Sequence, residues 1–254
     1  VWMNCRFPFP NRFVWEMFRL ILTDVPDISV FSPQTMVWRI MGLLPEYLDK
    51  PAFEVLCNYL STDGGNLKRF QLSERVADIF DRYAVYRPEM VLRWETSRDE
   101  GWQAQIWRAL VSGQQEAHRA GLWSSFLNRL RAGGITSKGL PERISVFGVP
   151  ALPDYHFEVL YGLASIVDVH FFLMSPTKEY WADIVPPSRM GPDESGNLHF
   201  ETGNPLLASM GKLGRDFFAM ILTRECEEFF SFDDPGNRCL LASIQSDILN
   251  LYER

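Results

Sequence analysis

The sequence predicts an α/β fold in which a parallel sheet is accompanied by a long all-helical insertion. Two apolar runs rich in β-branched residues, 143–149 and 166–174, end at turn residues and have the character of buried strands. The stretch between them, 154–165, has helical periodicity, so the three segments form a strand–helix–strand unit with parallel strands. A further strand is predicted at 5–9, and the pattern between it and the second strand is helical.

The helices are predicted from apolar residues that recur every three or four positions and from residues that start or stop helices. Asn11 is expected to cap the first helix, and Pro33 and Pro51 suit the first turns of the next two. Residues 185–203 are rich in Pro, Gly, Asp and Ser and are predicted to be a loop. The predicted helices are 11–22, 33–48, 51–60, 67–83, 88–95, 101–116, 119–132, 154–165, 205–222 and 240–251.

Composition and charge exclude several classes of protein. The chain has 254 residues, of which 46% are hydrophobic, and this content excludes a disordered tail. No apolar run reaches the ~20 residues that a membrane helix needs. The net charge of −7 excludes a general binder of polyanions. The charge is uneven, however, with +4 over residues 66–143 and −9 over 144–254, which suggests local contact with a nucleic acid or docking of a basic partner.

The cysteines do not indicate a disulfide framework or a metal site. They are scattered, without a C-x-x-C pair and without a histidine at zinc spacing. We therefore expect four free, buried thiols in a reducing compartment, namely Cys5, Cys57, Cys226 and Cys239.

Motifs that would indicate a catalytic or cofactor site are absent from the sequence. A phosphate-binding loop needs G-x-x-x-x-G-K-[ST], and the glycine–lysine stretches at 133–139 and 211–212 do not fit it. The patterns G-x-S-x-G, H-E-x-x-H and G-x-G-x-x-G do not occur. Asp154 and Glu158 lie on a predicted helix surface without the lysine that a Mg²⁺-dependent nuclease centre needs. The sequence predicts no catalytic residue, no metal and no cofactor.

A polar cluster on the predicted helix 67–83 is the remaining candidate for a binding site. Arg75, Asp78 and Arg82 share one side of that helix by their spacing. One interpretation is an exposed ladder of ion pairs. The other is readout of single-stranded nucleic acid, in which the carboxylate accepts hydrogen bonds from a base, arginine donates to a base or phosphate, and an aromatic ring such as Trp15 stacks.

Several strings of residues, in the same order and over almost the whole chain, resemble the family of the gamma subunit (RecC) of exodeoxyribonuclease V. The longest string is specific for the family by its length alone. The shorter strings support the resemblance because they occur in the same order. The strings are FPFP (7–10), FVWEMF (13–18), FQLS (70–73), ADIFDRY (77–83), VYRP (85–88), HRA (118–120), FGVPALP (147–153), YWADI (180–184), GNPLLASMGKLGRD (203–216) and IQSDIL (244–249).

The resemblance implies that this chain is a piece of a much larger protein, as an opening without an initiator Met also suggests. It implies a superfamily 1 helicase-like fold, of P-loop NTPase-like type, without a working ATP site. Residues 1–25 and 141–254 are then expected to form the helicase-like α/β domain, with a parallel sheet that is incomplete at its N-terminal end. Residues 26–140 are expected to form the helical insertion called 1B in this family.

For function, the resemblance implies a non-catalytic DNA-binding subunit of a RecBCD-type helicase–nuclease. Such a subunit works in a heterotrimer with RecB-type and RecD-type subunits in double-strand break repair and recombination. In that family this region lines the tunnel for the 3′-ended single strand and scans it for the Chi octamer. It implies no cofactor and no ATPase or nuclease site in this chain, and a cytoplasmic location.

The resemblance places eight positions of this sequence at the family's DNA-contacting residues. The resemblance assigns apolar contact or stacking to the two aromatic residues, base recognition to the two aspartates, an apolar contact to the isoleucine and a basic surface to the last two arginines. Arg82 departs from the pattern, because a neutral amide side chain is expected there, and it adds charge to the readout helix. The eight positions are Phe9, Trp15, Asp78, Ile79, Asp81, Arg82, Arg87 and Arg119.

An alternative function is a structural docking module that holds the partner helicase and nuclease subunits without reading DNA. The acidic C-terminal third favours docking to a basic partner. The isolated piece is expected to bind single-stranded DNA weakly, because few phosphate contacts are available and the net charge is unfavourable. It is also expected to be able to form a non-native dimer through an exposed sheet edge.

Overall fold

The computed structural model describes residues 5–61, 65–96, 98–114, 117–136, 139–184 and 203–252. The chain divides into two compact units. The first unit is Val1–Ile144 with Pro153–Val169, and the second is Ser145–Leu152 with His170–Arg254. Among the described residues, no helix is both long and apolar enough to cross a membrane.

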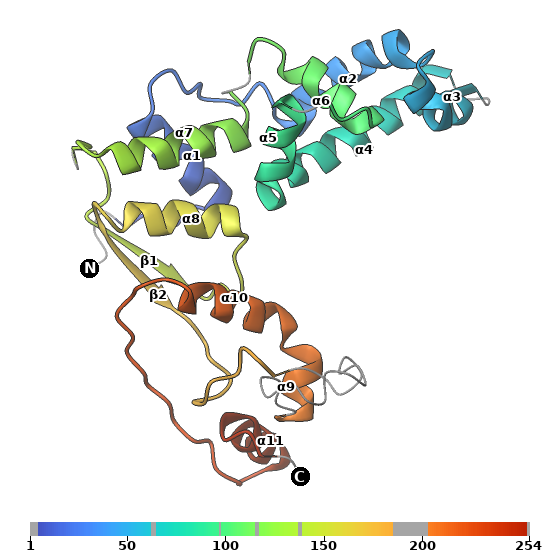
Figure 1. Cartoon of the computed structure of the whole chain (residues 1–254). Coiled ribbons are helices and arrows are strands. Elements are labelled where there is room, and N and C mark those ends of the chain that lie inside the picture. Colours follow the sequence, from blue (N-terminus) through green and yellow to red (C-terminus); the bar gives the residue numbers. More distant parts are fainter. Residues whose placement is uncertain are drawn as a thin grey trace. The chain divides into compact units, whose positions relative to one another are not determined.

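The first unit is helical, as its sequence pattern predicts (Figure 1). A short 3₁₀ turn, η1, leads into α3. Helix α4 is longer than predicted at both ends, and α6 ends earlier than predicted. The elements are α1 (Pro10–Ile21), α2 (Pro33–Tyr47), η1 (Pro51–Phe53), α3 (Glu54–Ser61), α4 (Gly65–Tyr86), α5 (Pro88–Thr96), α6 (Trp102–Val111), α7 (Arg119–Ala132) and α8 (Asp154–Leu163).

The predicted strand–helix–strand unit is confirmed. Strands β1 (Arg143–Phe147) and β2 (Asp168–Phe172) pair in a parallel two-stranded sheet, and α8 connects them. The prediction of a strand at 5–9 is wrong, because these residues are irregular and lead directly into α1. Pro8 and Pro10 have no backbone N–H for a strand ladder, which explains the difference. The α/β class therefore holds, with a sheet smaller than predicted.

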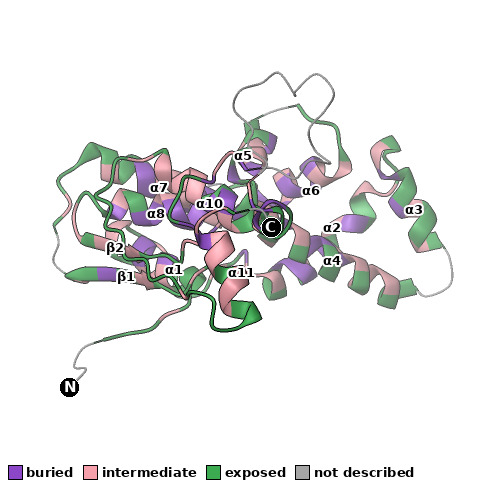
Figure 2. Cartoon of the chain, turned by 90° about the horizontal axis from the view of Figure 1, so that it is seen from below, coloured by how far each residue is buried: buried purple, intermediate pink, exposed green. Residues whose placement is uncertain are grey.

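The first unit has an aromatic-rich core between α2 and α4 and the helices that cover them. Helix α2 begins at Pro33 and is capped by Ser32, whose hydroxyl accepts the Thr35 amide N–H. Along α2 and α4 buried residues alternate with exposed ones (Figure 2). This core includes Phe31, Met36, Ile40, Leu44, Phe53, Val76, Phe80, Trp94, Ile106, Trp107 and Leu110.

A second packed region in the same unit joins α1, α7 and α8. Phe18 of α1 is fully buried and packs against the ring of Phe126 of α7, with centroids 5.1 Å apart. It also meets Tyr155 of α8 edge-on, at 6.3 Å. These rings pack α1, α7 and α8 against one another, and the same three helices carry polar residues described below.

The second unit contains α9 (Pro205–Met210), α10 (Lys212–Leu222) and α11 (Leu240–Leu249). Trp181, Ile184, Leu207 and Ala208 form its small buried core. A buried polar side chain links segments of this unit by hydrogen bonds to their backbone groups. The Asn204 side chain accepts amide N–H bonds at the start of α9 and donates to the Tyr252 carbonyl. The predicted loop at 185–203 lies outside the described residues except for its last position.

The single helix predicted at 205–222 is two helices that meet at Gly211. The Gly211 N–H donates to the Leu207 carbonyl at the end of α9, and α10 begins at the next residue. A Cβ at Gly211 would lie 2.5 Å from the Leu207 carbonyl oxygen and 3.2 Å from the Trp181 ring. Only a residue without a side chain fits this corner without moving the backbone.

Replacing Gly211 by alanine is therefore expected to destabilise the second unit by about 1–3 kcal/mol, since overpacking displaces neighbouring atoms. The matched control is Gly42→Ala in α2, where an added Cβ meets no atom within 4 Å. There alanine is expected to stabilise the chain by about 0.5–1 kcal/mol, because it favours the helix. Thermal unfolding of both variants measures the difference, and a Gly211→Ala protein as stable as the Gly42→Ala protein would contradict the packing argument.

Candidate nucleic-acid interface

Helix α4 places four of the candidate residues on or near its exposed side. Val76, Phe80 and Ala84 bury the opposite face of this helix in the core. Asp78 and Arg82 are exposed, and Ile79 is half-buried. No ion pair joins Arg75, Asp78 and Arg82 to one another among the described residues, so the structure provides no evidence for the ladder interpretation. Their groups remain accessible from solvent.

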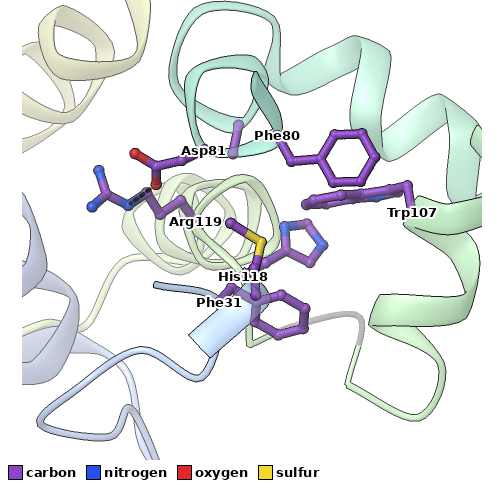
Figure 3. A pocket seen from close by; sticks show the side chains of 8 residues that line it. Phe31, Phe80, Asp81, Trp107, His118 and Arg119 are labelled. Atoms are coloured by element: carbon purple, nitrogen blue, oxygen red, sulfur yellow. Dashed lines mark ion pairs between the residues drawn. The ribbon is translucent and has the colours of Figure 1, made fainter. Parts of the chain in front are cut away.

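Asp81 lies on the same helix one turn after Asp78 and contacts α7. The Nε of Arg119, the first residue of α7, lies 3.4 Å from Oδ1 of Asp81 (Figure 3). Their side chains are 23% and 25% exposed, so the pair is partly shielded yet can be reached. Burial raises the pKa of the Asp81 carboxyl, Arg119 acts in the opposite direction, and Asp78 adds a smaller upward effect.

Arg119 also contacts α1 and lies near α8. Its Nη1 donates to Oδ1 of Asn11 at 3.2 Å, and Nε2 of His156 lies 2.9 Å from the same oxygen. His156 is buried in the first turn of α8, and its pKa is lowered to about 4 by burial and by the charge of Arg119. Three helix N-termini therefore meet at one polar cluster, which consists of Asn11, Asp81, Arg119 and His156.

His118, directly before Arg119, anchors the start of α7. Its Nδ1 accepts the Gly121 amide N–H as the helix N-cap, at 3.2 Å. Its Nε2 lies 2.8 Å from Oε1 of Glu95, which also accepts a hydrogen bond from Trp107 Nε1 at 3.1 Å. Because Nδ1 is an acceptor, the imidazole carries its proton on Nε2, facing the carboxylate. This buried network fixes where α7 begins and so where Arg119 lies.

A small cavity lies beside the ion pair. Phe31, Phe80, Trp107 and His118 line it together with Asp81 and Arg119 (Figure 3). Its volume is about 10 Å³, which is room for about one water molecule. The cavity is therefore part of the core and is too small for a base or a nucleotide.

The remaining candidates lie apart from this cluster or on its border. Phe9 is 84% exposed directly before α1. Trp15 is half-buried, donates from Nε1 to the Pro26 carbonyl at 3.1 Å and meets Phe18 edge-on. Arg87 is exposed between α4 and α5. The structure thus brings Asp81 and Arg119 into direct contact and leaves the other candidates without a contact that joins them.

Three residues of this region were not among the site residues predicted from the sequence. Asn11 was expected to cap a helix, but α1 begins at Pro10, Phe9 occupies the N-cap position without a side-chain cap, and Asn11 lies in the first turn. His118 occurred in the string HRA, which is the one sequence signal that included it. No sequence pattern singled out His156, because its partner Asn11 is 145 positions away.

The cysteines are free, as predicted, but their predicted burial is wrong. Cys5, Cys226 and Cys239 are exposed and Cys57 is half-buried. The three exposed ones lie in irregular segments or at a helix start, outside the packed cores.

Among the described residues, no group of three or more His, Cys, Asp or Glu side chains has an arrangement that could hold a metal ion.

The chain is similar over almost its whole length to proteins of one family. The family model described as "RecC, N-terminal domain" matches residues 1–251. The RecBCD enzyme subunit RecC of Escherichia coli (strain K12) is 36% identical over 99% of this chain and 26% of its own length. The same subunit of Haemophilus influenzae is 34% identical over 98% of this chain and 28% of its length, and that of Mycolicibacterium smegmatis 28% identical over 89% and 21%. The chain thus spans about a quarter of the length of these relatives.

Proposed function

Since this chain belongs to the RecC family and matches its N-terminal domain, we propose that it serves as a non-catalytic DNA-contacting part of a RecBCD-type helicase–nuclease. In this role it lines the path of the 3′-ended single strand and takes part in recognition of Chi during double-strand break repair. The partners are RecB-type and RecD-type subunits. The α/β sheet and the helices of 26–140 correspond, in this proposal, to a helicase-like domain with its helical insertion.

The observation that carries the proposal is the partly exposed Asp81–Arg119 pair. The Arg119 guanidinium contacts Asp81 through Nε and Asn11 through Nη1. These two contacts hold its charge in one place, and the side chain stays partly exposed. A carboxylate can accept hydrogen bonds from the edge of guanine, and a guanidinium can donate to a base or a phosphate. In this proposal exposed Phe9 and Asp78 supply an apolar ring and a second carboxylate.

The position of Arg119 distinguishes the Asp81–Arg119 pair from an ordinary surface ion pair. Arg119 is the first residue of a helix whose start is anchored by the His118–Glu95–Trp107 network. Its side chain therefore loses less conformational freedom when it binds a ligand than a free surface arginine would, which makes each contact more effective. Preorganisation of this kind is typical of residues that recognise a ligand.

Mutation of the pair in the full-length protein, assembled with its partner subunits, tests the proposal. Arg119→Ala and Asp81→Asn are each expected to weaken the response to Chi roughly 5- to 100-fold, as expected for one lost base or phosphate contact. DNA unwinding and ATP hydrolysis are expected to persist. The matched control is Arg93→Ala, which removes an exposed arginine of α5. An unchanged Chi response in both Arg119→Ala and Asp81→Asn would contradict the site assignment.

A second candidate function, docking of a partner subunit, is favoured by an acidic and aromatic segment in the second unit. Residues 225–235, in the long connection between α10 and α11, have no secondary structure (Figure 1). They include Phe229 and Phe230, which are 89% and 70% exposed. Five acidic residues lie in the same stretch. A basic and apolar partner surface would match it. Crosslinking of single-stranded DNA distinguishes the two functions, because direct readout places the crosslinks around Arg119, whereas a pure docking role places none there.

A further inference from the structure

The side-chain amide of Asn11 is held in one orientation by two donors. Nη1 of Arg119 lies 3.2 Å from its Oδ1 and Nε2 of His156 lies 2.9 Å from it. A guanidinium has N–H groups and no acceptor, so the atom that faces it is the amide oxygen and not the amide nitrogen. If the Asn11 amide turned over, its NH₂ group would face the guanidinium and the hydrogen bond from Arg119 would be lost.

His156 makes this orientation rigid. Its Nε2 faces an oxygen, so it carries the proton and donates, which leaves Nδ1 as an acceptor buried without a partner among the described residues. The imidazole is 5% exposed and meets the Tyr155 ring edge-on at 5.1 Å. Since its pKa is lowered to about 4, the ring is neutral, and the same donor is present, throughout the neutral pH range.

The nitrogen of the same amide is consequently turned outward. Asn11 is exposed, and its Nδ2 makes no hydrogen bond to any residue that the structure describes. It lies beside the charge of Arg119, two positions after the exposed ring of Phe9 and one helical turn before Trp15. An outward NH₂ group has two donors and no acceptor, so it suits a ligand that presents oxygen or nitrogen lone pairs.

We propose that Asn11 is a further DNA-contacting residue, whose amide nitrogen donates a hydrogen bond to an acceptor atom of the single strand beside Arg119. The inference rests on the proposed function, because it takes the ligand to be single-stranded DNA. Both a phosphate oxygen and a purine N7 or O6 have the required lone pair. In either case Asn11 adds a neutral, directional donor next to the charged one, and His156 is its positioning residue.

Asn11→Asp in the full-length protein, assembled with its partner subunits, is the direct test. Aspartate has the same shape and keeps acceptor oxygens for Arg119 and His156, but it replaces the outward NH₂ with an acceptor that repels the strand. Affinity for a single-stranded oligonucleotide is expected to fall about 5- to 30-fold at constant salt. The matched control is Asn128→Asp on α7, which makes the same change at an exposed asparagine whose Oδ1 accepts from Arg131. That control is expected to change affinity less than twofold.

Modified oligonucleotides show which acceptor is used. If Asn11 contacts a phosphate, one methylphosphonate position abolishes the difference between the wild-type and Asn11→Asp proteins. If it contacts a base, 7-deaza or O6-lacking purines at one position do so. A difference that survives every substitution overturns the assignment of a direct contact.

The Arg119→Ala variant separates failure of this inference from failure of the proposed function. Weak binding by Arg119→Ala together with equal binding by Asn11→Asp and Asn128→Asp overturns the role of Asn11 and leaves the function standing. Unchanged binding by both Arg119→Ala and Asn11→Asp overturns the proposed function itself. Equal assembly of all variants with the partner subunits, measured first, shows that the comparison is made between folded proteins.

Discussion

Replacement of Phe80 by alanine is expected to destabilise the first unit by about 3–5 kcal/mol. Phe80 is fully buried, and its ring meets those of Trp107 and Trp94 edge-on, with centroids 5.4 and 6.4 Å apart. Removal of the ring leaves a void that adjoins an existing small cavity. Closely packed neighbours fill such a void only in part, so the contacts of the ring are lost. Loss of the ring–ring contacts adds to the cost of the void.

Chemical denaturation followed by tryptophan fluorescence measures this effect, because Trp94 and Trp107 border the site. The control is Phe7→Ala, which removes the same side chain at a position that is 88% exposed and is expected to change stability by less than about 0.5 kcal/mol. Phe80 directly precedes Asp81, so a destabilised Phe80→Ala protein is also expected to position the Asp81–Arg119 pair poorly. Equal stability of the two phenylalanine variants would show that the rings do not pack as described.

Acidification is expected to destabilise the chain through His156. Its pKa is about 4 in the folded protein, against an ordinary value of 6.5, so the unfolded chain takes up a proton in a pH range where the folded protein does not. The free energy of unfolding is therefore not reduced by this histidine above pH 6.5, and it decreases as the pH falls from 6.5 towards 4. The loss amounts to at most about 3 kcal/mol.

Unfolding free energies measured between pH 7 and pH 4 test this linkage. His156→Gln removes the titrating group, so its stability is expected to fall less steeply over this range than that of the wild-type chain. His170→Gln makes the same replacement at an exposed histidine and is the control. An equally steep loss in the wild-type and His156→Gln proteins would mean that other groups, such as the carboxylates, account for the whole acid effect.

Local patterns in the sequence predicted most of the elements correctly. The apolar spacing of Met36, Ile40 and Leu44 is sufficient to predict α2, and these residues are indeed its buried face. The two apolar runs around α8 predict a parallel pair of strands, which the structure contains. The prediction of a strand at 5–9 is wrong because Pro8 and Pro10 have no N–H groups for a strand ladder.

The candidate site shows the limit of such patterns. Asp81 and Arg119 entered the prediction through resemblance to a family, one residue at a time, and nothing in their spacing indicated that they meet. The division into residues 1–25 with 141–254 and residues 26–140 also stays a prediction. The sequence does not predict Asn11 and His156 as members of the site, since a hydrogen bond across 145 positions leaves no trace in local periodicity.

The amino-acid sequence alone determines most of the helices, the strand–helix–strand unit around α8 and the membership of the family. It also shows that nucleotide-binding motifs are missing. Each of these depends on neighbouring residues or on strings that can be compared. The convergence of α1, α4, α7 and α8 on one polar cluster required the folded chain. The packing of Phe18, Phe126 and Tyr155 holds α1, α7 and α8 together, and Arg119 contacts both Asp81 and Asn11. These contacts join residues far apart in the sequence, so they depend on tertiary packing and not on neighbouring residues.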